Sequence, residues 1–348
     1  MSPPTPDLTH SFATAPDGAK LSYYTIGTGP PLLILHGAVT HALTHKELAV
    51  ALSPYFTVHT ASRRGRGLSD PYPTSLPEAL VPNPGSGSDS LTYNPDFTAA
   101  VLAVETSDLQ ALLHATQARY LIAVSSGALI TLQHLLTKTT TSSSQATQLE
   151  KVILFEPPLF AKEDYPTSPS ITQYEAERAA GDDVSAMVTA MQIVQLGPGW
   201  VPRWLMRWVV GIMFRTERRR GAGAAAGDGK AGDDGAVQEE GNVGMKGLGA
   251  LLRFDFAVAE GMAGCEDRFV QQEVGTGAVG EWGLSQRVML LGGDTSPAYL
   301  KKGLDLLVKL LGARKTVIGG VGHEVLCGPE MRGRPEKAVP AICKFLRE

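Results

Sequence analysis

Short, wholly apolar runs recur along this sequence, and each ends in small or polar residues. The clearest are PPLLILHG (30–37), RYLIAV (119–124), KVILFEPP (151–158) and RVMLLGGD (287–294). Apolar runs of this length, without alternating polar positions, are typical of strands buried on both faces of a sheet. Because segments with helical spacing separate them, the sequence predicts parallel strands joined by right-handed helical crossovers, which is an α/β fold.

The remaining pattern divides the chain into a core and an inserted segment. Further strands are predicted at 21–27, 55–61 and 315–320, helices at 45–52, 97–115, 128–136, 169–195, 301–312 and 336–346, and a loop at 71–95. We expect a core made of residues 1–158 and 284–348, interrupted by a helical segment over 159–283. Within that segment, residues 217–248 are rich in Gly, Ala and charge. Such a stretch buries too little apolar surface to offset its ordering entropy, so we expect it to be mobile.

The composition narrows the classes of function. A net charge of −4 over 348 residues gives no indication of a nucleic-acid partner. The three cysteines are widely spaced and match neither a metal-site spacing nor a disulfide framework. We therefore expect no metal or cofactor, and a reducing, cytoplasmic compartment. No apolar run reaches the roughly 20 residues that span a bilayer, and the N-terminus lacks the signal-peptide pattern.

Two adjacent serines separate a predicted strand from a predicted helix in the sequence AVSSGA (123–128). Ser125 has the small residues Ala123 and Gly127 two positions before and after it. A serine so placed can occupy a sharp, strained strand-to-helix turn that lifts its hydroxyl above the sheet. Taking Ser126 instead would place β-branched Val124 at a position that needs a small residue. Ser125 is thus the candidate nucleophile, although a serine here could also simply cap the helix.

A serine nucleophile needs a histidine base and an acid that orients the base. In a parallel sheet these residues follow later strands, in the order serine, acid, histidine. Asp294 follows the strand at 287–293, and His323 follows the next one. An oxyanion would be bound by the backbone amide of Ser126, at a helix N-terminus, and by that of Ala38 in the His-Gly-Ala turn.

Taken together, the motifs HGA, RRGRGLSD, VSSGA, GGDTSP and GGVGHE resemble the α/β-hydrolase superfamily. The resemblance covers residues 11–160 and 287–345. It implies a mostly parallel eight-stranded sheet, helices on both faces, and a helical lid inserted after the sixth strand. It assigns Ser125 as nucleophile, His323 as base and Asp294 as acid. Glu156 is an alternative acid, because some relatives use the loop after the sixth strand.

The predicted function is a hydrolase that cleaves an ester, thioester or related acyl bond through an acyl-enzyme. Two alternatives stay open: a non-hydrolytic or carbon–carbon bond-cleaving enzyme on the same scaffold, and a catalytically silent ligand-binding protein. The only partner expected is a small, apolar substrate, and the sequence leaves the oligomeric state undetermined. The candidate pocket residues are His36 and Gly37 together with Trp204 and Trp208.

Two further features have competing interpretations. The arginine-rich turn RRGRG (63–67) could clamp a nucleic acid, but a surface turn paired with neighbouring carboxylates fits the composition better. Three of the four tryptophans recur every fourth residue from Trp200 to Trp208. This spacing favours one aromatic face of a lid helix that packs on the core, and contact of that face with the substrate is the second interpretation. Because arginines flank that face, a membrane-surface helix is a weaker alternative.

Overall fold

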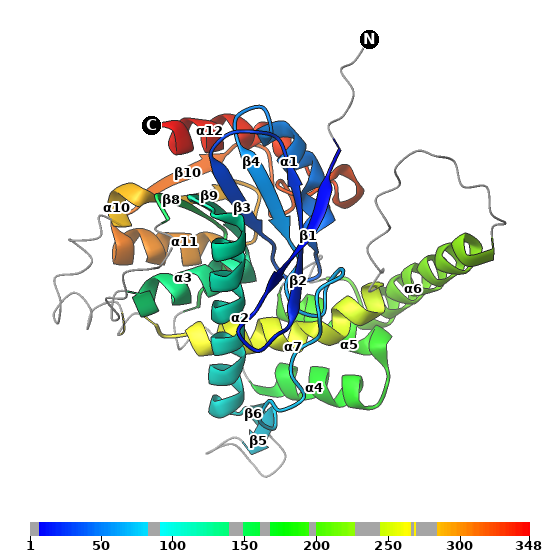
Figure 1. Cartoon of the computed structure of the whole chain (residues 1–348). Helices are drawn as coiled ribbons and strands as arrows, with labels where there is room; N and C mark the ends of the chain where they lie inside the picture. The colour runs from blue at the N-terminus through cyan, green and yellow to red at the C-terminus, as the bar shows by residue number, and fades with distance from the viewer. Residues whose placement is uncertain are drawn as a thin grey trace.

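An eight-stranded sheet forms the centre of the molecule (Figure 1). The computed structural model describes residues 7–82, 91–138, 149–160, 168–194, 200–226, 244–265, 268 and 284–348. The strands are β1 (Thr9–Thr14), β2 (Lys20–Ile26), β3 (Pro31–Leu35), β4 (Thr57–Ala61), β7 (Tyr120–Val124), β8 (Lys151–Phe155), β9 (Val288–Gly293) and β10 (Arg314–Ile318). They lie in the order β1-β2-β4-β3-β7-β8-β9-β10. The β1–β2 and β2–β4 pairs are antiparallel, whereas every pair from β4 to β10 is parallel.

The apolar runs build a separate core on each face of the sheet, because successive side chains of a strand point to opposite faces. In β3, Leu33 and Leu35 belong to one core, and Leu32 and Ile34 to the other. The same alternation holds in β7, where Leu121 and Ile122 lie in opposite cores. The central strands are therefore buried on both sides, as their uninterrupted apolar sequence predicts.

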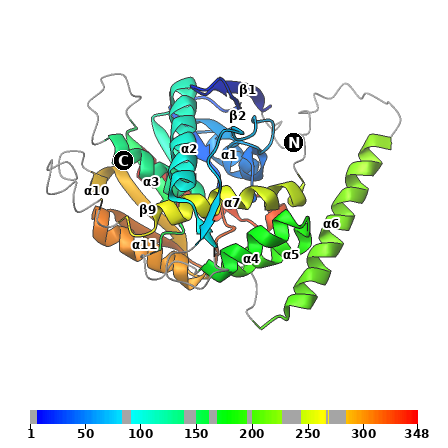
Figure 2. The same ribbon diagram turned by 90° about the horizontal axis from the view of Figure 1, so that it is seen from below.

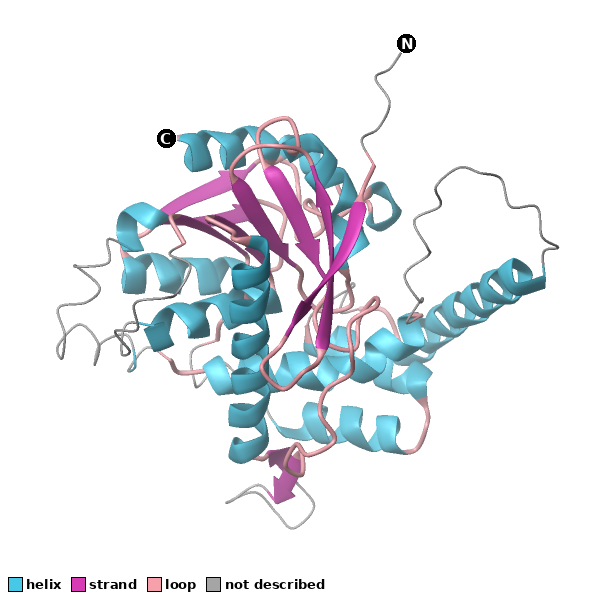
Figure 3. Ribbon diagram, viewed as in Figure 1, coloured by secondary structure: helices cyan, strands magenta, loops and turns pink. Residues whose placement is uncertain are grey.

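Helices cover both faces (Figure 3). In the core they are α1 (Lys46–Leu52), α2 (Pro95–Thr116), α3 (Ser126–Lys138), α10 (Leu284–Arg287), α11 (Ala298–Leu311) and α12 (Val339–Arg347), with short 3-10 turns η1 (Ala42–His45), η3 (Pro329–Met331) and η4 (Pro335–Lys337). Buried residues of α2, α3 and α11 share one core, whereas those of α1 and α12 share the other. This arrangement confirms the predicted fold class.

In the described part of the chain between β8 and α10 lie the helices α4 (Ser168–Ala179), α5 (Asp183–Ile193), α6 (Arg203–Ala226) and α7 (Met245–Met262). We call them the inserted helices. The predicted helix over 169–195 is in fact two, because the chain turns at Gly181, whose φ is +73°. Figures 1 and 2 show α7 against the body of the molecule and α6 extending away from it.

Two segments predicted to be irregular contain regular structure in their described parts. The stretch 217–248 is helical at both ends, since α6 continues to Ala226 and α7 begins at Met245, and its middle, 227–243, lies outside the described residues. The predicted loop at 71–95 contains a small two-stranded sheet of β5 (Leu80–Pro82) and β6 (Leu91–Tyr93). Among the helices of the described ranges, none combines the length and apolar character that crossing a membrane requires.

Candidate active site

Ser125 lies where β7 ends and α3 begins, in the strained turn that the sequence predicts. Its φ is +54°, in the left-handed region that non-glycine residues rarely adopt. Its amide donates to the carbonyl of Phe155 on β8 at 2.8 Å, and its carbonyl accepts from the amide of Ala128 at 2.9 Å. The turn is thus held both by the neighbouring strand and by the first turn of α3.

The glycines on either side of this turn allow two backbones to approach each other closely. A Cβ on Gly37 would lie 2.7 Å from the Cβ of Ser125, and one on Gly127 would lie 2.6 Å from the carbonyl oxygen of His36. The loop after β3 therefore rests directly against the serine and the start of α3. Within the described residues, the amides of Ala38 and Ser126 donate no hydrogen bond. These two amides, which the sequence predicts as oxyanion donors, belong to the two segments that meet here.

The acid that contacts His323 is Glu156, the alternative in the sequence prediction. The Nδ1 atom of His323 lies 2.7 Å from Oε2 of Glu156, whose side chain is fully buried. Oε1 of the same carboxylate accepts from the amide of Gly293 at 2.7 Å. Glu156 has φ +42°, and a Cβ on Gly292 would lie 3.0 Å from Oε1. A left-handed backbone and a missing side chain on β9 together make room for this carboxylate.

Asp294, the acid preferred from the sequence, does not contact the imidazole. Its side chain is exposed, and Oδ1 accepts from the amides of Gly320 and Val321 at 2.8 and 3.3 Å. These hydrogen bonds, the one from Gly320 first, lower the pKa of the Asp294 carboxyl. The expected pairing of Asp294 with His323 is therefore wrong. Asp294 instead fastens the loop that carries the histidine.

Ser125 and His323 flank the same residue of β8. The ring of Phe155 lies 5.8 Å from the imidazole, with 20° between the two planes, and the carbonyl of Phe155 accepts from the Ser125 amide. No hydrogen bond joins the Ser125 hydroxyl to His323 in the described part of the chain. Catalytic hydrogen bonds of this kind are often long before substrate binds. With Nδ1 on Glu156, Nε2 is the imidazole nitrogen left for the serine.

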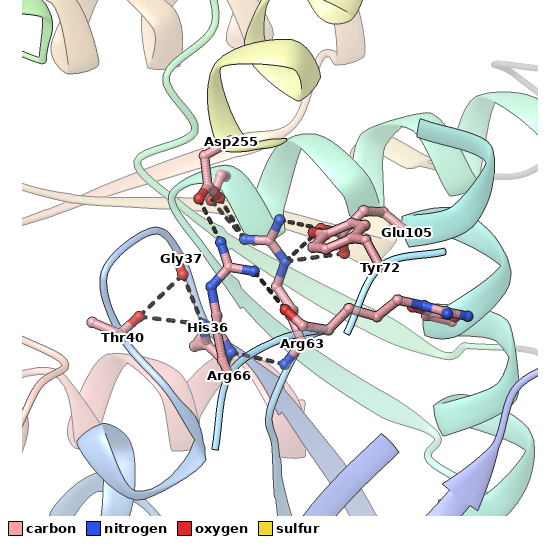
Figure 4. Close-up of polar contacts among 11 residues, drawn as sticks. His36, Gly37, Thr40, Arg63, Arg66, Tyr72, Glu105 and Asp255 are labelled. Carbon is pink, nitrogen blue, oxygen red and sulfur yellow. Dashed lines mark hydrogen bonds and ion pairs between the residues drawn. The ribbon is translucent and has the colours of Figure 1, made fainter. Parts of the chain in front are cut away.

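The arginine-rich turn after β4 is buried, not on the surface as expected. Arg63 and Arg66 are 2% and 0% exposed, and Figure 4 shows both side chains directed toward Asp255. Arg63 pairs with Glu105 of α2 and, at 2.7 Å, with Asp255 of α7. Arg66 pairs with the other oxygen of Asp255 at 2.5 Å. The prediction that carboxylates neutralise the turn is confirmed, and the partner on α7 is a residue that the sequence did not indicate.

His36 is a buried structural residue, and the proposal that it lines a pocket is wrong. Its side chain is 0% exposed, and its Nε2 accepts from the backbone amide of Arg63 at 2.9 Å. Burial, aided by the nearby charges of Arg66 and Arg63, lowers the pKa of His36 well below its usual value. A neutral ring with its proton on Nδ1 fits these contacts, since Nδ1 faces the carbonyl of Gly37 at 2.7 Å.

The tryptophans do not form a pocket wall either. Trp204 and Trp208 are 70% and 62% exposed on α6, and Trp200 before the helix is 81% exposed. The helix that carries Trp204 and Trp208 extends from the body of the molecule (Figure 2). The expectation that this aromatic face packs on the core is therefore wrong. In the described ranges, no cluster of three or more His, Cys, Asp or Glu side chains could hold a metal ion.

Comparisons with solved structures agree with the observed architecture. An alpha/beta hydrolase from Sphaerobacter thermophilus superposes with a TM-score of 0.63 at 21% identity, over 97% of this chain and 100% of the other. An esterase from Exiguobacterium antarcticum gives 0.55 at 17%, over 97% and 99%. A bromoperoxidase from Bacillus anthracis gives 0.54 at 14%, over 98% and 100%. No protein-family model matches the sequence, and neither does any curated protein.

The chain therefore has the fold of the α/β-hydrolase superfamily, as the sequence motifs predicted. Solved neighbours with this fold include esterases and an epoxide hydrolase. Because one fold supports several reactions, and identity to these neighbours is low, the fold does not select the chemistry. The reaction must be argued from the residues at the strand ends.

Proposed function

We propose that this chain is a serine hydrolase that cleaves an ester, thioester or related acyl bond through an acyl-enzyme. Ser125 is the nucleophile, His323 the general base and Glu156 the acid that orients it. The observation that carries the proposal is the 2.7 Å contact between His323 and buried Glu156, one strand away from a serine with a left-handed backbone. An aspartate at position 125 would have suggested epoxide opening instead.

The chemistry follows from these positions. Nε2 of His323 takes the proton of Ser125 as Oγ attacks the acyl carbon, and the amides of Ala38 and Ser126 stabilise the resulting oxyanion. Collapse breaks the bond to the leaving group, which receives the proton from His323. A water molecule deprotonated by the same nitrogen then attacks the acyl carbon, the bond to Oγ breaks as His323 returns that proton to Ser125, and the acid is released. Throughout, Glu156 keeps the proton of the imidazole on Nδ1 and stabilises the imidazolium.

The inserted helices are the proposed lid, since they follow β8 and α7 lies next to α3. The tryptophans that suggested an apolar substrate face solvent, so the proposal is confined to the acyl bond. We also propose a cytoplasmic location, because Cys265, Cys327 and Cys343 are free thiols.

The test is labelling with a fluorophosphonate, followed by mass analysis of the intact protein and of its peptides. We expect one adduct, on Ser125, and hydrolysis of p-nitrophenyl esters that Ser125→Ala abolishes. Ser53→Ala is the matched control, because that hydroxyl donates to the carbonyl of Val50 at the end of α1. Full activity in Ser125→Ala, or an adduct elsewhere, would refute the assignment. A wild-type protein that is neither labelled nor active would instead support the silent binding protein.

A further inference from the structure

Two arginines and two carboxylates form a buried, charge-balanced network beside the candidate site (Figure 4). Arg63, Arg66, Glu105 and Asp255 are each at most 5% exposed. The Tyr72 hydroxyl donates to Glu105 and extends the network. Asp255 is the member that both arginines share, and the only one of the five on an inserted helix. Removing one member of such a network destabilises the fold, because it leaves a buried charge without its partner.

Ser126 belongs to this network through its side chain. Its hydroxyl donates to Oδ1 of Asp255 at 2.7 Å and accepts from Nη1 of Arg63 at 3.0 Å. The side chain is therefore held from two directions by charged groups, and hydrogen bonds to charged groups are stronger than neutral ones. The same residue starts α3 and carries the amide proposed to bind the oxyanion.

Arg63 also contacts the loop that carries the second proposed oxyanion donor, Ala38. Its backbone amide donates to Nε2 of His36, which lies two residues before Ala38. Its guanidinium meanwhile contacts Ser126 and Asp255. One arginine thus connects the two segments that supply the oxyanion amides, and Asp255 holds that arginine in place.

The two arginines favour the charged form of the Asp255 carboxyl. Burial alone would raise its pKa, but the positive charges of Arg66 and Arg63 outweigh burial and lower it. An anion at this point accepts hydrogen bonds from Ser126 and from both arginines, which a neutral carboxylic acid could not do equally well.

We propose that Asp255 is a positioning residue: through Ser126 and Arg63 it fixes the backbone amides that bind the oxyanion, so the inserted helix α7 helps to set the rate of acyl transfer. This inference rests on the proposed function. Donors of an oxyanion site act in the transition state only when they are held in place beforehand. Loss of the positioning contacts should therefore lower kcat and leave KM nearly unchanged.

The decisive variant is Ser126→Ala, which removes the hydroxyl and keeps the amide. We expect kcat to fall about tenfold, less than the loss of a whole donor would cause, with KM within about twofold. Asp255→Asn should lower kcat at least as much. The double variant should be no slower than the slower single variant, because both changes break the same contact. Rates are divided by the fraction of protein that a fluorophosphonate labels, so that unfolded molecules do not count.

The matched control is Glu175→Gln, another buried carboxylate of the inserted helices. Glu175 bonds Tyr93 at 3.0 Å and Arg178 at 2.9 Å, and is 3% exposed. We expect it to reduce stability while keeping kcat within about twofold of wild type. If Asp255→Asn does not fold, the comparison of Ser126→Ala with this control decides the question.

Three results would overturn the inference. The first is a wild-type kcat in Ser126→Ala. The second is a loss of kcat in the double variant equal to the product of the two single losses, and the third is a loss in Glu175→Gln as large as that in Ser126→Ala. If the wild type is labelled on Ser125 and turns over esters while Ser126→Ala matches it, only the positioning role fails. If the wild type is not labelled at all, the proposed function fails and the positioning role fails with it.

Discussion

Replacing Glu156 by glutamine tests the orientation of the imidazole directly. In the native site, Oε1 accepts from the Gly293 amide and Oε2 faces Nδ1 of His323, both at 2.7 Å. A glutamine must turn its carbonyl oxygen toward the Gly293 amide, which can only donate. Its NH2 group then faces Nδ1 and donates to it. The ring proton is forced onto Nε2, so this nitrogen can no longer accept the proton of Ser125.

The size of the effect follows from this change of tautomer. Where an amide replaces the acid of a serine–histidine–acid set with its geometry intact, kcat falls by about 10⁴. We expect a loss of about 10³–10⁴ in Glu156→Gln, equivalent to roughly 4–5.5 kcal/mol of transition-state stabilisation. KM should change little, because the substituted group does not touch the substrate.

Asp294→Asn is the matched control, since both carboxylates follow neighbouring strands. The asparagine keeps an oxygen for the Gly320 amide, so kcat should stay within about threefold of wild type. The assay is p-nitrophenyl ester hydrolysis with active sites counted by fluorophosphonate. A large loss in Asp294→Asn with near-normal turnover in Glu156→Gln would show that His323 is oriented by Asp294 during catalysis, and would refute the reasoning.

Three other predictions follow from buried or crowded positions. Gly292→Ala should lower kcat about tenfold, because its Cβ would lie 2.6 Å from Cδ1 of Leu304 and 3.0 Å from Oε1 of Glu156, which displaces the carboxylate; unchanged steady-state kinetics would contradict this. Burial lowers the pKa of His45 to about 4, so its contribution to stability is present above pH 6.5 and is lost as the pH falls toward 4. Urea titrations should show a loss of about 3 kcal/mol from this residue, and His45→Gln, which keeps a donor for the Leu326 carbonyl, should flatten the profile. Trp204→Ala with Trp208→Ala should leave kcat/KM for a small ester within about twofold and remove much of the acrylamide-quenchable fluorescence; a strong loss of activity would show that these side chains contact substrate.

The fold could be predicted because its signals are local. Strands buried on both faces are wholly apolar, as Leu121 and Ile122 illustrate, and the small residues around Ser125 mark the sharp turn. The choice between Asp294 and Glu156 is not local. Both follow strands of the same sheet, and the outcome depends on the backbone of Glu156 and on the space left by Gly292. The pair of glycines that ends β9 is the one sequence signal that could have indicated this.

The inserted helices were harder to predict, because their contacts depend on distant residues. Asp255 lies 192 positions after Arg63, and no sequence pattern near either residue indicates that they form an ion pair. Composition alone could therefore not distinguish a buried arginine-rich turn from an exposed one. For the tryptophans a local signal was present, but it gave a wrong prediction. Their four-residue spacing is typical of a packed helix face, yet that face is exposed.

The place of Asp255 on α7 restricts how the molecule can open. If α7 swung outward, it would carry this carboxylate away and leave Arg66 without a counter-ion in the protein interior, which is prohibitive in a low-dielectric environment. If the inserted helices act as the proposed lid, α7 should therefore stay in place while α4, α5 and α6 move.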